Sequence, residues 1–158
     1  MMGTLRHAEV RDYDPIIQVI DEWWGGRPMA GMLHRLFFEH FQPTSFVIEE
    51  DSEIVGFLVG FRSQTAPTQA YIHFVGIHPA KRGQGLGRRL YERFFAMARQ
   101  LGCSEVRAIT SPVNTGSVAF HTRMGFAILP GDSHINGIAI STTYDGRGHD
   151  RVRFRRAI

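Results

Sequence analysis

Residues 70–88, AYIHFVGIHPAKRGQGLGR, change character twice within a short stretch, and the rest of the fold follows from them. Tyr71 to Ile77 is rich in β-branched and aromatic residues, which favour a half-buried strand, and Pro79 limits how far that strand continues. Alternate glycines follow from Arg82 to Gly87, where the missing Cβ atoms leave backbone N–H groups open to an anion. The stretch therefore predicts a strand, a tight loop and the start of a helix.

An apolar repeat at helical spacing predicts the helix that follows the glycine loop. Its members are Leu86, Leu90, Phe94, Met97 and Leu101. Because the N-terminal end of a helix carries partial positive charge, the loop and the helix start together predict a phosphate site. A P-loop is excluded because no Lys-Ser or Lys-Thr pair occurs. A dinucleotide-binding fingerprint is excluded because its third glycine is one position too early, with Arg88 in its place.

Length and composition limit the number of domains, the disulfide content and the cellular location that we expect. The 158 residues predict a single domain, residues 1–158, long enough to bury one core. The single cysteine, Cys103, excludes an intramolecular disulfide, and residues 1–12 lack the apolar segment of a signal peptide. Since no apolar run reaches membrane-spanning length, we expect a cytoplasmic protein with no membrane partner. The formal charge of +3 suits a polyanionic coenzyme as well as nucleic acid.

The first 61 residues predict two helices and three strands. Thr4–Glu9 is the expected first strand, and Asp14-Pro15 signals a helix start that ends at Gly25-Gly26. A second helix is expected to end before Pro43. Its apolar stripe is Met29, Met32, Leu33, Leu36, Phe37 and His40. The hairpin strands are expected at Ser45–Glu50 and Ile54–Phe61.

With the strand at residues 71–77, the chain is expected to form four consecutive antiparallel strands before its first crossover. Glu105–Thr110 alternates charged and apolar residues and predicts a fifth strand, which the preceding helix makes parallel to the fourth. Residues 130–149 are rich in glycine and predict a long surface segment, with a hint of a strand at Ile138–Ile140. Residues 151–155 predict a final strand.

Residues 111–126, SPVNTGSVAFHTRMGF, form a second motif. Alone, Asn114 predicts a helix cap and Gly125 a helix C-terminus. Taken with the glycine loop, the spacing of Asn114, Ser117, Phe120 and Gly125-Phe126 resembles the GNAT superfamily of acyl-CoA N-acyltransferases. The resemblance covers nearly all of the chain and is strongest from residue 71 to residue 126.

This resemblance implies an α+β fold: a central mixed, mostly antiparallel sheet with helices on both faces, splayed between the fourth and fifth strands. It implies transfer of the acetyl group of acetyl-CoA to a primary amine, with both substrates bound together and no metal. Backbone N–H groups near residues 75–77 are expected to stabilise the oxyanion. The implied coenzyme-binding residues are Val75, Gly76, Ile77, Arg82, Gly83, Gln84, Gly85, Leu86, Gly87, Arg88, Asn114, Ser117, Phe120 and His121.

His121 stands where the family usually carries the tyrosine assigned to protonate the departing thiolate. A thiolate with a conjugate pKa of about 8.5 is a stronger base than imidazole at about 6.5, so a histidinium could deliver that proton. Because most of an ordinary histidine is neutral at pH 7, His121 could instead donate only a hydrogen bond. A helix histidine without a role is the third alternative.

His73 is the candidate general base that deprotonates the acceptor amine. It is expected to alternate onto one strand face with Tyr71, Val75 and Ile77, and arylalkylamine acetyltransferases carry histidines at the positions of Tyr71 and His73. The alternative is that His73 has no catalytic role and is a half-exposed strand histidine hydrogen-bonded to a neighbour. The family's glutamate base maps near Tyr71, so that form of the mechanism is absent.

The expected acceptor-binding side chains are those of Tyr71, His73, Trp23 and Phe37, although core packing is the preferred interpretation of Trp23 and Phe37. Residues His134, Asn136, Tyr144 and Asp145 could also contact the acceptor, and their spacing shows no zinc pattern. The expected partner is a small-molecule or peptide amine, and a homodimer is left open. Two alternatives are a non-catalytic acyl-CoA sensor and a nucleic-acid-binding module, the second of which lacks any reading motif.

Overall fold

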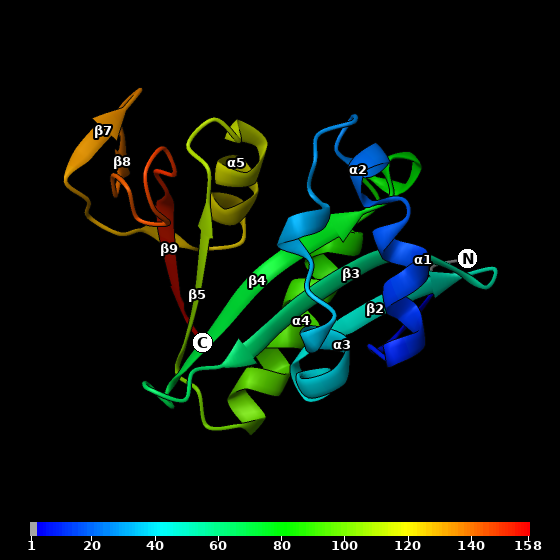
Figure 1. The fold of residues 1–158 in the computed structure, drawn as a ribbon. Coiled ribbons are helices and arrows are strands. Elements are labelled where there is room, and N and C mark those ends of the chain that lie inside the picture. The colour runs from blue at the N-terminus through cyan, green and yellow to red at the C-terminus, as the bar shows by residue number, and fades with distance from the viewer. Residues whose placement is uncertain (1–2) are drawn as a thin grey trace.

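A mixed seven-stranded sheet runs through the computed structural model, which describes residues 3–158 (Figure 1). Its strands are β1 (Thr4–His7), β2 (Phe46–Glu50), β3 (Glu53–Arg62), β4 (Gln69–Ile77), β5 (Glu105–Thr110), β6 (Ala127–Ile128) and β9 (Val152–Ala157). They lie in the order β1-β2-β3-β4-β5-β9-β6, with β4 and β5 parallel and the other neighbours antiparallel. The expected α+β class and the four antiparallel strands before the first crossover are confirmed.

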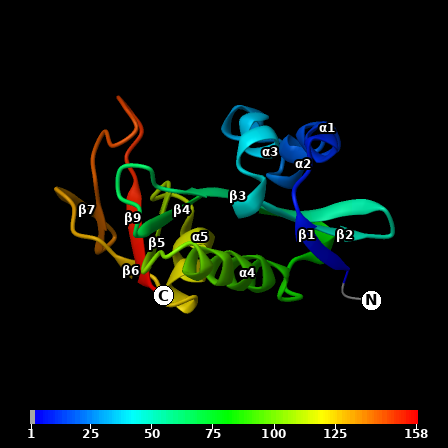
Figure 2. The same cartoon turned by 90° about the horizontal axis from the view of Figure 1, so that it is seen from below.

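Helices cover both faces of this sheet (Figure 2). The first face carries α1 (Tyr13–Ile17), α2 (Ile20–Trp23) and α3 (Leu36–His40), and the other face carries α4 (Leu86–Gln100). After β5 comes α5 (Thr115–Arg123), which lies beside α4. Short 3₁₀ turns are η1 (Val10–Asp12), η2 (Ala30–Met32), η3 (Gln42–Thr44) and η4 (Pro79–Lys81).

The prediction of two continuous helices between residues 14 and 40 is wrong. The first is interrupted between α1 and α2, and the second is reduced to η2 and α3. One Asp21 carboxylate oxygen accepts the backbone N–H groups of Met29 and Ala30 at 2.8 and 2.9 Å, which fixes a turn where helix was expected. The predicted apolar stripe of the second helix is only partly right, because Leu33 and Phe37 are buried whereas Met32, Leu36 and His40 are exposed. Ile16, Ile20 and Trp23 from the first helical segment pack in the same core as Leu33 and Phe37.

The predicted amphipathic helix after the glycine loop is confirmed as α4. Leu86, Leu90 and Phe94 are buried against the sheet, and Met97 and Leu101 pack at the edge of the same core. A fully buried leucine or phenylalanine contributes about 1.5–3 kcal/mol of transfer free energy. This packing holds the start of α4, and with it the glycine loop, close to the end of β4.

The strands β4 and β5 stay together only at one end. Their ladder pairs Gln69–Tyr71 with Glu105–Arg107, and beyond Tyr71 the two strands diverge (Figure 1). The expected splay between the fourth and fifth strands is therefore confirmed. From Ile72 onward, the edge of β4 faces an opening instead of a neighbouring strand.

A β-bulge interrupts β4 at the residue that sequence analysis singled out. Val59 of β3 pairs with Phe74, whereas the next residue, Gly60, pairs with Ile72, so His73 is the extra residue on β4. The bulge reverses the inward and outward alternation, and the prediction that Tyr71, His73, Val75 and Ile77 share one face is wrong. Tyr71 stacks on Phe61 of β3, and His73 stacks on Phe37 of α3. Val75 and Ile77 pack against the core below α4.

The C-terminal segment is more ordered than predicted. It forms a hairpin of β7 (Ser133–Ile135) and β8 (Ile138–Ile140), whose turn residues Asn136 and Gly137 both have positive φ.

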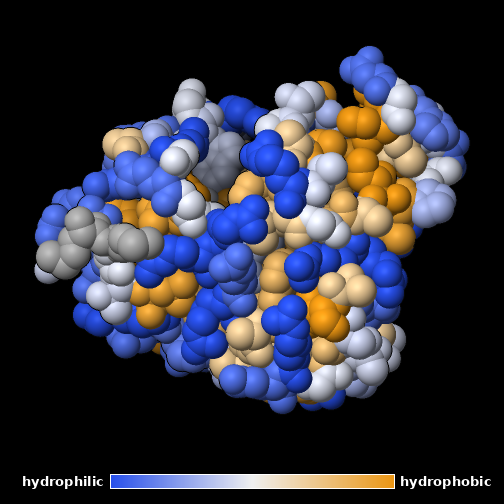
Figure 3. All heavy atoms as spheres, turned by 180° about the vertical axis from the view of Figure 1, so that it is seen from behind, coloured by the Kyte–Doolittle hydropathy of each residue, from blue (hydrophilic) through white to orange (hydrophobic). Residues whose placement is uncertain are grey.

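Seen from behind, hydrophobic residues gather toward the end of the molecule that carries this hairpin (Figure 3). Among residues 3–158, no helix has the length and apolar character needed to cross a bilayer.

Candidate active site

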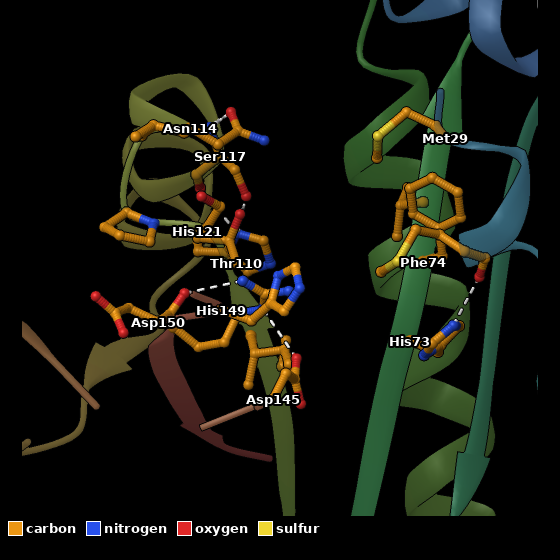
Figure 4. A pocket seen from close by; sticks show the side chains of 18 of the residues that line it. Met29, His73, Phe74, Thr110, Asn114, Ser117, His121, Asp145, His149 and Asp150 are labelled. Carbon is orange, nitrogen blue, oxygen red and sulfur yellow. Dashed lines mark hydrogen bonds and ion pairs between the residues drawn. The ribbon is translucent and has the colours of Figure 1, made fainter. Parts of the chain in front are cut away.

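A cavity of about 670 Å³ occupies the opening between β4 and β5 (Figure 4). One wall is formed by β4 and by residues 24–32, and the other by β5, the start of α5 and residues 145–151. His73 lies on the first wall and His121 on the second (Figure 4). The fold therefore brings both predicted catalytic histidines to one cavity.

The ring of His73 is held in one orientation. Its Nε2 lies 2.8 Å from the backbone oxygen of Met32, and its plane stacks on Phe37 with centroids 4.9 Å apart and 15° between the planes. A carbonyl oxygen only accepts hydrogen bonds, so Nε2 carries the hydrogen and Nδ1 of the neutral ring keeps a lone pair. Burial lowers the pKa of His73 below 6.5, against the opposing effect of the Met32 bond. The ring is therefore a neutral base at pH 7.

His121 is buried and both of its ring nitrogens have partners. Nδ1 lies 2.8 Å from the Ser117 backbone oxygen, and Nε2 lies 2.8 Å from the Tyr91 hydroxyl. Because Nδ1 must donate to the carbonyl, Nε2 of the neutral ring accepts the Tyr91 O–H. Burial lowers the pKa of His121, and its face stacks on Phe154 at 4.4 Å. The resting form is a neutral imidazole that orients a tyrosine hydroxyl.

The glycine loop keeps its backbone accessible. Gly83 and Gly85 have φ values of +77° and +81°, a region that favours glycine, and a Cβ at either position would meet no described atom within 4 Å. Gly85 precedes the first residue of α4, and no side chain caps the helix there. The first N–H groups of a 15-residue helix are thus free to bind an anion such as a phosphate.

Comparison with known proteins identifies this arrangement. The sequence model described as "Acetyltransferase (GNAT) family" matches residues 9–126. The chain belongs to this family. A curated relative, the L-methionine sulfoximine/L-methionine sulfone acetyltransferase of Salmonella typhimurium, is 32% identical over 137 residues, which covers 79% of this chain and 80% of that protein.

Other relatives match over shorter stretches. The L-2,4-diaminobutyric acid acetyltransferase of Virgibacillus pantothenticus is 33% identical over 82 residues, 52% of each chain. The chain spans about half the length of the first such relatives it matches. Among solved structures, Ard1 from Thermoplasma volcanium aligns with a TM-score of 0.79 at 20% identity, covering 100% of this chain and 99% of that one. These structural likenesses establish the GNAT fold.

The predicted acceptor residues of this GNAT protein do not all reach the cavity. Tyr71 and His73 line it. Trp23 is buried against Phe57 instead, and its neighbour Trp24 lines the cavity. Phe37 is buried beneath His73, where it supports the ring. The sequence repeat placed Trp23 and Phe37 on an apolar face correctly, and core packing is the role that the geometry gives them.

Some of the predicted coenzyme residues support the surrounding fold, and others line the cavity. Arg82 donates from its guanidinium to the backbone oxygens of Trp23 and Ile77, so it ties the glycine loop to α2 and β4. The side chains of Leu86 and Phe120 belong to the core around α4, and Gly76 lies under the rings of Phe57 and Trp24. Val75, Asn114, Ser117 and His121 line the cavity. Gly83, Gln84, Gly85, Gly87 and Arg88 stay predictions for the phosphate end of the coenzyme.

Asn114 has the role that its sequence context alone predicted. Its side-chain oxygen accepts the Ser117 backbone N–H at 3.1 Å, which caps α5, and its amide NH₂ group remains available at the cavity wall. Gly125 ends α5 with a positive φ. At the facing position of α4, a Cβ on Gly87 would lie 3.3 Å from the Phe120 ring, so this glycine lets α4 and α5 approach.

The sequence interpretation missed several residues of the cavity. Asp145 is the predicted C-terminal residue that does reach it, whereas His134, Asn136 and Tyr144 are not among the lining residues. Tyr91 was not singled out, although its hydroxyl is the partner of His121. Other lining residues that were missed include Arg27, His149, Asp150 and Arg151. No signal marked these four, because they come from loops whose paths a repeat does not predict. Met29 and Met32 were expected only on a helical apolar stripe, and they also line the cavity.

Proposed function

We propose that this protein is an N-acetyltransferase that moves the acetyl group of acetyl-CoA directly to the primary amine of a small molecule. The observation that carries the proposal is the single cavity lined by His73 on one wall and by Tyr91 and His121 on the other. Two of the matched relatives are named for free amino-acid acceptors, which supports a small-molecule amine.

The coenzyme binds along the opening between β4 and β5, next to the starts of α4 and α5. The backbone N–H groups from Gly83 to Leu86 hold its phosphates, and the amide of Asn114 and the free edge of β4 hold its arm. Acetyl-CoA supplies an activated thioester. A backbone N–H at residues 75–77 of β4 stabilises the negative charge that develops on the acetyl oxygen.

His73 accepts the proton that the acceptor ammonium must lose before its nitrogen can attack. Nδ1 provides the lone pair because Nε2 is tied to Met32. The lowered pKa makes the imidazole a weaker base than an ordinary histidine, yet it favours the basic form at pH 7. His73 passes this first proton to solvent. The C–N bond then forms as the C–S bond breaks, and His73 accepts the second proton that the nitrogen loses as it becomes an amide.

The pair Tyr91 and His121 faces the departing sulfur. Burial raises the pKa of Tyr91, so the phenol stays protonated. In the resting structure its one hydrogen is accepted by His121 Nε2, and as the C–S bond breaks this hydrogen turns to the sulfur and donates a hydrogen bond, not a proton. His121 acts as a positioning residue that fixes the hydroxyl. The coenzyme sulfur leaves as a thiolate and takes its proton from water on release. The histidinium acid, one of the three alternatives that the sequence left open for His121, is not part of this proposal.

A thiol-release assay tests the proposal. Purified protein is mixed with acetyl-CoA and a panel of primary amines, and free coenzyme thiol and N-acetyl product are both quantified, while calorimetry measures acetyl-CoA binding. We expect equal amounts of thiol and acetylated amine with at least one acceptor. Tight acetyl-CoA binding without turnover on any amine would instead favour the acyl-CoA sensor.

A further inference from the structure

The cavity carries charges of both signs at its acceptor end. Arg27 and Arg151 supply two cations, and Asp145 and Asp150 supply two anions. Between them lies an apolar surface from Trp24, Met29, Met32 and Phe74. A site with this lining matches a short apolar body that bears one positive and one negative group.

Arg27 differs from the other cation of this cavity. The Arg151 Nε lies 2.9 Å from an Asp145 carboxylate oxygen, and its NH1 group donates to the Asp150 backbone oxygen. Within residues 3–158, the Arg27 guanidinium makes no hydrogen bond or ion pair with another residue. It follows the Gly25-Gly26 turn and is exposed on the wall formed by residues 24–32. Its planar, permanently charged fork is suited to a carboxylate.

Asp145 belongs to a loop that is braced in place. Asp132 accepts the Thr142 backbone N–H at 2.8 Å, and Asp150 accepts that of Thr143 at 2.8 Å. In Figure 4, Asp145 lies on the wall opposite His73. Arg151 offsets part of the Asp145 charge, and the rest acts across the cavity, where it opposes the lowering of the His73 pKa by burial. A cation that enters between Asp145 and His73 therefore gains favourable electrostatic energy.

We infer that the acceptor is a small free amino acid whose carboxylate binds Arg27 while its ammonium group is drawn between Asp145 and His73. This inference rests on the proposed function. The volume of about 670 Å³ must also hold the acetyl end of the coenzyme, which leaves room for a small acceptor only. Arg27 repels polyamines, and a peptide N-terminus offers no carboxylate next to its amine.

The test compares amino acids with their amides, which keep the amine and lose the negative charge. We measure kcat/KM for each pair with the wild-type protein, Arg27→Gln and Arg27→Glu. Arg147→Gln is the control, because Arg147 lies in the loop that carries Asp145 but is not among the lining residues, and its replacement changes the net charge equally. The ratio of kcat/KM for an amino acid to that for its amide is compared between variants, because this comparison cancels the difference in amine reactivity between the two compounds.

We expect Arg27→Gln to lower kcat/KM for amino acids about tenfold or more and to leave the amides nearly unchanged. Arg27→Glu should shift the preference toward diamines, Arg147→Gln should match the wild type, and acetyl-CoA affinity should be the same in all variants. The inference is overturned if wild type prefers amides or diamines, or if Arg27→Gln leaves the ratio unchanged. If no amine releases thiol, the proposed function itself fails.

Discussion

The Tyr91 hydroxyl lies 2.8 Å from Nε2 of His121, and the opposite nitrogen of the same ring is held by the Ser117 backbone oxygen. This pair fixes the tautomer of His121 and the direction of the Tyr91 O–H bond without any titration near pH 7. It also supplies a phenol from α4 at the wall of the cavity, where α5 carries a histidine in place of the tyrosine usual in GNAT proteins.

The first prediction concerns this pair. Tyr91→Phe removes only the hydroxyl, and we expect kcat to fall about tenfold or more because the leaving sulfur loses its donor. His121→Phe should slow turnover similarly, and the double variant should be no slower than either single one, since the two side chains act as a unit. Steady-state kinetics with saturating acetyl-CoA measures all three.

The same variants separate a neutral pair from a histidinium acid. With a neutral pair, the wild-type kcat should not decline as pH rises from 6 to 8. A decline through this range that disappears in His121→Tyr would show instead that a His121 cation delivers the proton, because a tyrosine does not titrate until about pH 10.

The second prediction places the coenzyme phosphates at the glycine loop. Gly85→Asp adds a side chain and a negative charge where the backbone is open, and we expect acetyl-CoA affinity to fall more than tenfold, about 1.4 kcal/mol. Gly102→Asp is the matched control, since Gly102 also has a positive φ and open surroundings but lies at the other end of α4. Calorimetry on the folded variants would refute the assignment if both bind acetyl-CoA equally well.

The third prediction assigns the base. His73→Gln should cut turnover at pH 7 by roughly 10² or more, the usual contribution of a positioned base, and higher pH should restore part of it. His34→Gln is the control, because the exposed His34 ring lies 5.8 Å from His73 without a hydrogen bond to it. In the wild type, the acidic limb of kcat/KM should lie below pH 6.5. Wild-type turnover in His73→Gln would assign the base to another group or to water.

The fourth prediction concerns stability in acid. Burial lowers the pKa of His73 and of His121, so both bind protons more tightly in the unfolded chain. The stability they contribute is complete above about pH 6.5 and is lost as pH falls toward their lower folded values. Urea unfolding between pH 8 and 5 should show a smaller acid loss in His73→Gln/His121→Gln than in the wild type. An equal loss in both proteins would mean that other groups control acid stability.

Much of this fold could be predicted because its periodic elements are long. The strand, loop and helix at residues 70–88 follow from β-branched residues, alternate glycines and a helical repeat. The helical region at residues 14–40 could not be predicted in detail, since the Asp21 carboxylate competes with helix by binding the backbone at Met29. Local side-chain bonds of this kind leave no trace in an apolar repeat.

The site residues that belong to a sequence motif could be predicted. Those that only the tertiary fold brings together could not. His73 was found from its strand, yet the bulge that turns it toward Phe37, away from the face of Val75, depends on the register with β3. Nothing in the sequence marks Tyr91 as a site residue, because it lies within a predicted helix and its partner His121 is 30 residues away in sequence. Arg27 and Asp145 meet at one cavity only because two loops fold over the splayed strands.

The measurement that tests the central claim most directly is a single turnover with acetyl-CoA labelled in its acetyl group. The protein is mixed with the labelled coenzyme and an amino-acid acceptor, and product, free thiol and protein are each analysed by mass spectrometry. We predict one labelled N-acetyl product for each thiol released, and no label on the protein when the amine is left out. Label on the protein without amine, or bound coenzyme that transfers nothing to any amine, would contradict direct acetyl transfer in this cavity.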